Sequence, residues 1–297
     1  MIITLFVIIS ITFFISKLLP GTPFADDKLT PEIRRQLFEK YGLDEPLYVQ
    51  YVKYMLNVAQ GDLGNSFYFE SRPVLRVILE QLPVSMFLGV QAVISGLFVG
   101  LVLGIVAALR HNTWLDTFAV VLAVLGVSVP SFVLGPLMQY WLGVKLEWFP
   151  IAFFESWWHS VLPSLALSVF VVSTVARFVR SEMLEVMGQD YITLAKAKGL
   201  SSLAVIVRHV LRNAMIPLVT VLAPLTVYII TGSLVIEQIF AVPGIGEQFV
   251  ASVRVNDYSM ILGTTVFFSF LFIIALLIQD ILYGIIDPRI RVSGAKE

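Results

Sequence analysis

The chain has 297 residues, of which 58% are hydrophobic and only 14% are charged, and its formal net charge is -1. Soluble domains carry about 25% charged residues, so this chain lacks the polar surface to cover itself in water, and lipid must be its solvent. The near-neutral charge indicates no nucleic-acid partner, and the absence of cysteine excludes disulfides and cysteine-based metal or redox sites.

Six apolar runs are long enough to cross a hydrocarbon core about 30 Å thick, which takes about 20 residues. They are residues 1–19, 84–109, 117–142, 157–177, 214–236 and 259–283. Backbone groups in lipid must be satisfied internally, so each run is expected to be a helix. Leu18-Leu19-Pro20-Gly21 is a poor signal cleavage site, so we expect residues 1–19 to be retained. The sequence predicts an all-α membrane protein with a core domain over residues 84–290 and a tail over residues 291–297.

Basic residues in the loops set the orientation, because Lys and Arg gather on the cytoplasmic side. One side of the membrane holds ten of them, namely Arg110, Arg177, Arg180, Lys196, Lys198, Arg208, Arg212, Arg289, Arg291 and Lys296. The other side holds Lys145 and Arg254, leaving out the long first loop. We therefore expect both termini and the segment 188–213 to be cytoplasmic.

Two external segments carry local structure. Residues 20–83 contain Thr30-Pro31, a helix start with a cap and a proline at the first position. A second short helix is expected over Pro46–Val58, and the two together predict an extracytoplasmic cap. After the fifth span, Glu237 is followed by Pro243, Gly244 and Gly246, which favour a bend over a continuing helix.

Residues suited to catalysis are hard to find. The three histidines, His111, His159 and His209, lie in different segments, and there is no His-Glu-x-x-His motif. No Gly-Lys dipeptide occurs, so a Walker A loop is excluded and any ATP must bind to another chain. The second, third and fifth runs contain no charge, which disfavours an ion-coupled secondary transporter. A membrane scaffold or sensor remains a further alternative.

The second run contains two overlapping Gly-x-x-x-Gly motifs, formed by Gly96, Gly100 and Gly104. Small residues one turn apart let helix backbones approach closely. Packing within the chain is the simpler explanation, and a subunit interface is the alternative.

The basic segment Asp190–Asn213 lies between two apolar runs. On a helical wheel Leu203, Val207, Val210 and Leu211 form one apolar stripe opposite the basic residues, and Gly199 permits a sharp turn before it. The pattern fits a helix resting on anionic lipid or a surface on which another protein docks.

With these motifs in their order, the chain resembles the permease subunits of bacterial ATP-binding-cassette importers, in the oligopeptide, dipeptide and nickel permease family. The resemblance covers nearly the whole chain. It rests on Pro20-Gly-Thr-Pro23, Tyr41–Tyr51, Gly61–Ser66, Ser128–Phe132, Leu162-Pro-Ser164, Ala176–Arg180, Asp190-Tyr191, Ala195–Ser201, Arg208–Asn213, Glu237–Gly246 and Asp287-Pro-Arg289.

The resemblance implies a six-helix, type I importer permease fold in the bacterial cytoplasmic membrane. It also implies that residues 188–213 form the segment that couples to the ATPase, with Gly199 as the motif glycine and Ala195 as its second alanine. Thr193 and Leu194 depart from the general Glu-Ala pair. The implied coupling residues are Asp190, Tyr191, Ala195, Lys196, Ala197, Lys198, Gly199, Leu200, Ser201 and Arg208.

The implied partners are a second homologous permease, two ATPase subunits that bind ATP and magnesium, and an extracytoplasmic binding protein. This chain would itself catalyse no reaction and bind no cofactor. Di- and oligopeptides are the implied cargo, with a nickel chelate or glutathione as alternatives, and no substrate-binding residue is assigned.

Overall fold

The computed structural model describes residues 2–18, 21–24, 30–69, 71–230 and 233–286, the side chains of 282–286 excepted. The described part is helical apart from turns and one isolated antiparallel bridge between Asn65 and Pro73. Residues 19–20, 287–290 and the predicted tail 291–297 lie outside it.

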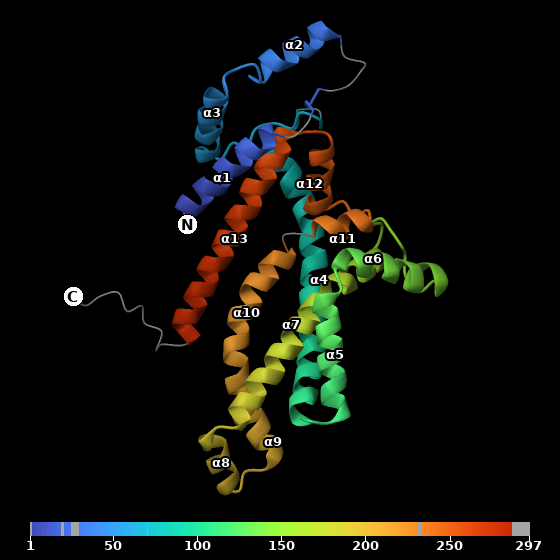
Figure 1. Ribbon diagram of the computed structural model, residues 1–297, viewed down its shortest axis with the longest axis vertical. Coiled ribbons are helices and arrows are strands. Elements are labelled where there is room, and N and C mark those ends of the chain that lie inside the picture. The colour runs from blue at the N-terminus through green and yellow to red at the C-terminus, as the bar shows by residue number, and fades with distance from the viewer. Residues whose placement is uncertain (1, 19–20, 25–29, 70, 231–232, 287–297) are drawn as a thin grey trace, which may run out of the picture.

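The segment predicted to form an external cap precedes the long helices. Helix α1 (Ile2–Lys17) is followed by α2 (Pro31–Lys40) and α3 (Leu47–Ala59). As the sequence predicts, the Thr30 side chain accepts a hydrogen bond from the Ile33 amide at 3.4 Å, and Pro31 begins α2. Figure 1 shows α2 and α3 at the end of the molecule opposite α8 and α9.

Four helices are long and apolar enough to cross a membrane: Val74–Leu109, Trp157–Met187, Ser202–Ile239 and Tyr258–Ile281. The pair Trp114–Ser128 and Ser131–Lys145 passes the same test, and Ile2–Lys17 is a shorter apolar helix. These findings confirm a helical membrane protein, while the count of six spans stays a prediction.

The individual elements of the bundle differ in bounds from the predicted spans. They are α4 (Val74–Leu109), α5 (Trp114–Ser128), α6 (Ser131–Met138), the π-helix η1 (Gln139–Lys145), the 3₁₀-helix η2 (Trp157–Ser160), α7 (Val161–Met187), α10 (Arg212–Ile230), α11 (Leu234–Ile239), α12 (Ile245–Arg254) and α13 (Tyr258–Ile286). Helix α4 starts ten residues before the predicted run and contains Pro83. The predicted boundary at 83 between cap and core therefore falls inside a helix.

The third predicted span, residues 117–142, is wrong as a single helix. Helix α5 ends at Ser128, and the chain turns by 105° into α6 and η1. Pro130 has no amide hydrogen to donate, and its ring pushes the preceding residue away from helical geometry. Val129 accordingly adopts extended backbone angles, φ -84° and ψ 117°.

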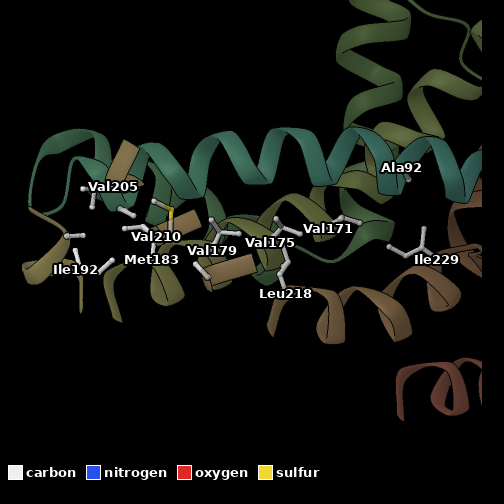
Figure 2. Packing of buried hydrophobic residues seen from close by; sticks show 13 residues of the cluster. Ala92, Val171, Val175, Val179, Met183, Ile192, Val205, Val210, Leu218 and Ile229 are labelled. Carbon is white, nitrogen blue, oxygen red and sulfur yellow. The ribbon is translucent and has the colours of Figure 1, made fainter. Parts of the chain in front are cut away.

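The core lies between α4, α7 and α10. Figure 2 shows Val171, Val175 and Val179 of α7 within a buried cluster that also contains Leu218 of α10. A Cβ atom on Gly96 would lie 2.5 Å from the Val171 Cβ, and one on Gly100 would lie 2.8 Å from the Val175 Cβ.

The third glycine of the series continues this contact. A Cβ atom on Gly104 would lie 2.8 Å from the Ala176 carbonyl oxygen. Packing between α4 and α7 within the chain therefore accounts for all three glycines.

Candidate functional site

The segment predicted to couple to an ATPase forms the end of the molecule opposite the cap (Figure 1). It contains α8 (Asp190–Ala197), α9 (Ser202–Val205) and the π-helix η3 (Ile206–Leu211), which leads into α10. Gly199 turns the chain between α8 and α9 with φ +80°, a region that L side chains disfavour. The Ser201 side chain caps α9 by accepting a hydrogen bond from the Ala204 amide at 3.3 Å.

One face of this segment is held inside the protein. Ile192, Val205 and Val210 are each at most 2% exposed, and they belong to the cluster that contains Met183 of α7 (Figure 2). In addition, the Asn213 amide nitrogen donates to the Tyr191 hydroxyl at 3.2 Å and to the His209 carbonyl at 2.8 Å. The segment is therefore firmly joined to α7 and α10.

Five large apolar side chains of the segment are exposed. We call them the docking face; they are Tyr191, Leu194, Leu200, Leu203 and Val207. Leu203 is 71% exposed and Leu194 is 55% exposed. The basic residues Lys196, Lys198 and Arg208 are exposed on the same segment. Exposed apolar side chains gathered within one short segment and flanked by charged ones are typical of a surface that binds a partner.

The sequence predicted that Leu203, Val207, Val210 and Leu211 form one apolar stripe. This is wrong in one respect, because the four side chains do not all face the same way. Val210 is 1% exposed, whereas Leu203 and Val207 face outward. The π-helix η3 has i to i+5 hydrogen bonds and a wider turn, so side chains spaced for a 3.6-residue period no longer share one face.

Nine of the ten expected coupling residues are exposed, and Ala195 alone is buried at 6%. Ala195 packs inward in the cluster around α7. Its small side chain thus allows α8 to approach the bundle, while its neighbours Lys196 and Lys198 face outward.

A partly buried ion pair joins the helix ends near this segment. Arg180 of α7 donates from Nε and Nη2 to the two carboxylate oxygens of Asp116, at 2.5 and 2.9 Å. The same carboxylate accepts from the Asn112 amide at 3.0 Å and lies 3.0 Å from His111 Nδ1. The pair ties the turn between α4 and α5 to α7, and sequence analysis missed its partners because 64 residues separate them.

The motif predicted to lie on the external side is organised around a buried carboxylate. Glu237 is 1% exposed and lies inside α11, before the turn at Pro243 and Gly244 where the bend was predicted. Its oxygens accept hydrogen bonds from the backbone amides of Gly246 at 2.8 Å, Glu247 at 3.3 Å and Ser233 at 3.2 Å. A buried carboxylate is tolerated when its oxygens are hydrogen-bonded in this way.

The glycines of this motif give the carboxylate its room. A Cβ atom on Gly244 would lie 2.2 Å from Glu237 Oε2 and 2.5 Å from Ser85 Oγ, and one on Gly246 would lie 2.9 Å from the same carboxylate oxygen. Pro243 precedes them in the turn between α11 and α12, where the bend is found. Gly246 itself lies in the first turn of α12.

A second buried carboxylate fastens the external cap. Asp257, fully buried before α13, accepts hydrogen bonds from Ser66 Oγ at 2.5 Å and the Phe67 amide at 3.1 Å. The two segments are 191 residues apart in the chain, so no local pattern indicated the contact.

The cap is also joined to α1. Lys17 donates to the side-chain oxygen of Gln50 in α3 at 2.7 Å. Burial raises the pKa of the Tyr54 phenol in α3, so this group stays neutral. The cap is therefore joined to α1 through Lys17 and to the start of α13 through Asp257.

A cavity of about 620 Å³ opens beside the break in the third span. The bend supplies Val129 and Pro130, α7 supplies Phe170, α10 supplies Tyr228 and α13 supplies Phe268. The walls are mainly apolar. Within the described residues no group of His, Asp and Glu is placed to hold a metal ion.

Known proteins share both sequence and fold with this chain. Residues 100–292 match the family described as binding-protein-dependent transport system inner membrane component. The dipeptide transport system permease protein DppB of Lactococcus lactis is 44% identical, with 98% of this chain and 96% of that protein covered. DppB of Bacillus subtilis is 46% identical over 97% of this chain and 94% of its own length.

More distant similarity extends this result. The oligopeptide transport system permease protein OppB of Haemophilus influenzae is 40% identical over 97% of this chain and 95% of its own length. A solved structure titled as an amino acid ABC transporter with histidines matches 73% of this chain and 95% of its own, with a TM-score of 0.52 and 14% identity, which shows a shared fold. The chain therefore belongs to the family of binding-protein-dependent transport system inner membrane components.

Proposed function

We propose that this chain is the permease subunit of an ATP-driven importer of di- and oligopeptides. It pairs with a second, homologous permease, and two ATPase subunits bind the cytoplasmic face. The names of the similar proteins support peptide cargo, and the lack of a Gly-Lys dipeptide supports an ATP site on another chain.

The docking face carries the proposal. Five large apolar side chains are exposed on a segment whose other face is anchored in the core. Figure 1 places α8 and α9 beyond the turn between α4 and α5, which argues against a helix that rests in lipid. A rigid, anchored element can transmit the movement of an ATPase to α7 and α10 as a rigid-body shift.

The cavity at the third-span break supports a role in the translocation pathway. Its walls come from seven helices, namely α1, α5, α6, α7, α10, α11 and α13, and α10 is the continuation of the docking segment. A movement at α9 would therefore reach the cavity wall through the continuous helical run of α9, η3 and α10. The second permease would supply the remaining wall, and an extracytoplasmic binding protein would deliver cargo to the α2–α3 cap.

Co-purification tests the proposal. The control variant Tyr48→Asp is matched to Leu203→Asp, since both wild-type side chains are 71% exposed and they lie at opposite ends of the molecule. A carboxylate at Leu203 removes apolar contact worth about 1.5–3 kcal/mol, so recovery of the ATPase subunit should fall at least tenfold while Tyr48→Asp retains it. Equal recovery of the ATPase with both variants would overturn the assignment of the docking face.

Uptake assays then identify the cargo. Vesicles that contain the complete transporter should accumulate a labelled dipeptide when ATP is supplied, and unlabelled dipeptide should compete. If a nickel chelate or glutathione competes for uptake and peptides do not, the cargo is that compound and not a peptide.

A further inference from the structure

One helical arm leaves the bundle sideways. The lateral arm, Ser131–Lys145, consists of α6 and η1 and is turned by 105° from α5. Helix α5 has 15 residues and so rises about 22 Å from the turn between α4 and α5, which brings the arm near, and not beyond, the far boundary of a hydrocarbon core about 30 Å thick. Figure 1 shows the arm extending away from α4 and α7, at the level of α11.

The inner half of the lateral arm is fixed to α11. Gly135 is buried, and a Cβ atom there would lie 3.3 Å from Ile236 Cδ1. The Gln139 amide nitrogen donates to the carbonyl oxygens of Ile151 at 2.6 Å and Ile239 at 3.1 Å. The direction of the arm is therefore set by packing and hydrogen bonds.

The outer half exposes large side chains along one stripe. Tyr140 is 47% exposed, Trp141 57% and Val144 52%. The arm continues the exposed apolar surface of α5, where Phe118 is 53% and Leu125 52% exposed. That surface belongs to a candidate membrane span, so the arm extends a face that lipid already covers.

Tryptophan is concentrated at this place. Four of the five tryptophans in the chain lie between residues 141 and 158, and each is between 47% and 64% exposed: Trp141, Trp148, Trp157 and Trp158. Lys145 lies 5.6 Å from the centre of the Tyr140 ring. Tryptophan and tyrosine are enriched where hydrocarbon meets water, because their rings are apolar and their N–H or O–H groups bind water and headgroups.

We propose that the lateral arm, with the residues up to Trp158, is an interfacial anchor that lies in the plane of the membrane. It sits at the level of the lipid headgroups on the face opposite the coupling segment, with the rings at the acyl boundary and the Lys145 ammonium among the headgroup phosphates. Because the arm is joined to α11, the anchor fixes the depth of the loop around Glu237 while other elements move.

The alternative to lipid is a second permease that packs against this surface. Membrane helices that pack together favour small residues at their contact, whereas the exposed stripe of the arm is built from aromatic and branched side chains. Its polar neighbours Lys145 and Glu147 are also exposed. These features favour lipid.

Depth measurements on the assembled transporter test the proposal. The chain contains no cysteine, so single spin labels can be attached in complexes whose partner subunits are also cysteine-free. The arm sites are all exposed positions, and only variants that retain ATP-driven uptake are measured: Val133→Cys, Leu137→Cys, Trp141→Cys and Val144→Cys. A control series along α5 uses Phe118→Cys, Leu122→Cys and Leu125→Cys.

The accessibility of each label to oxygen and to a water-soluble nickel complex gives its depth in the bilayer. We expect the four arm labels to share one shallow depth, at which both oxygen and the nickel complex reach them, while the α5 labels change steadily in depth. A steady change along the arm would show that it crosses the membrane. Low accessibility of the arm labels to both reagents would show that protein covers the arm. A label depth near the bilayer centre would exclude the headgroup level. Any of these three results would overturn the proposal.

Discussion

Substituting Gly199 can separate the effect of backbone strain from the effect of lost coupling to the ATPase. It has φ +80°, and a Cβ atom placed on it would meet nothing within 4 Å. Gly61, in the external turn after α3, has the same φ of +80° and equally open surroundings. Valine at either position therefore imposes a similar strain on the isolated chain, and only position 199 lies on the coupling segment.

The size of the strain follows from the left-handed conformation, which costs an L residue about 1–2 kcal/mol. That cost corresponds to a factor of about 5–30 in the population of the native turn. Asparagine tolerates this conformation better than valine, so Gly199→Asn should lose less. Because nothing in the chain itself touches the new side chain, any larger loss at position 199 must come from the partner or from a changed angle between α8 and α9.

The assay compares Gly199→Val with Gly61→Val in vesicles that contain the complete transporter. Both variants should insert and should lower the thermal unfolding temperature by similar amounts. Gly199→Val alone should reduce peptide uptake per ATP hydrolysed at least tenfold, with Gly199→Asn in between. Uptake and hydrolysis by Gly199→Val at the level of Gly61→Val would refute the reasoning.

Three further substitutions test the packing in detergent by thermal unfolding. Gly100→Ala places a Cβ 2.8 Å from the Val175 Cβ and should lower the free energy of unfolding by about 1–3 kcal/mol. Phe98→Ala, on a side chain that is 70% exposed, should change it little. Equal effects of the two substitutions would contradict the close packing of α4 against α7. Gly244→Ala should be strongly destabilising in the wild type and less so when Glu237 is already alanine, since the carboxylate is its nearest neighbour; additive effects would argue against this contact. Asp116→Asn should cost about 1–3 kcal/mol by weakening charged hydrogen bonds to its arginine partner, and unchanged stability would show that the ion pair is unimportant.

The sequence predicted correctly those features that depend only on residues close to one another in the chain. Thr30-Pro31 begins a helix because the hydroxyl satisfies an orphan amide and proline needs none. Gly199 forms the turn because only glycine adopts its backbone angles without strain. Long apolar runs predicted helices because lipid offers no other partner to the backbone.

Features that depend on distant contacts were not predictable in the same way. The π-helix Ile206–Leu211 changed which residues of the coupling segment face outward, and a 3.6-residue wheel has no means to show this. The run 117–142 was predicted as one helix, whereas the chain turns by 105° after Ser128 and the arm beyond the turn packs through Gly135 against α11. The Asp116–Arg180 and Asp257–Ser66 contacts join segments 64 and 191 residues apart.

The central claim is that a conformational change in an ATPase bound to the docking face drives transport through this chain. The most direct measurement is dipeptide uptake into vesicles that contain the purified complex, with and without its ATPase subunits, in the presence of an ionophore that removes ion gradients. The account predicts ATP-dependent uptake that the ionophore leaves unchanged and that disappears when the ATPase subunits are omitted. Uptake by the chain without ATPase subunits, driven by an ion gradient and abolished by the ionophore, would contradict it.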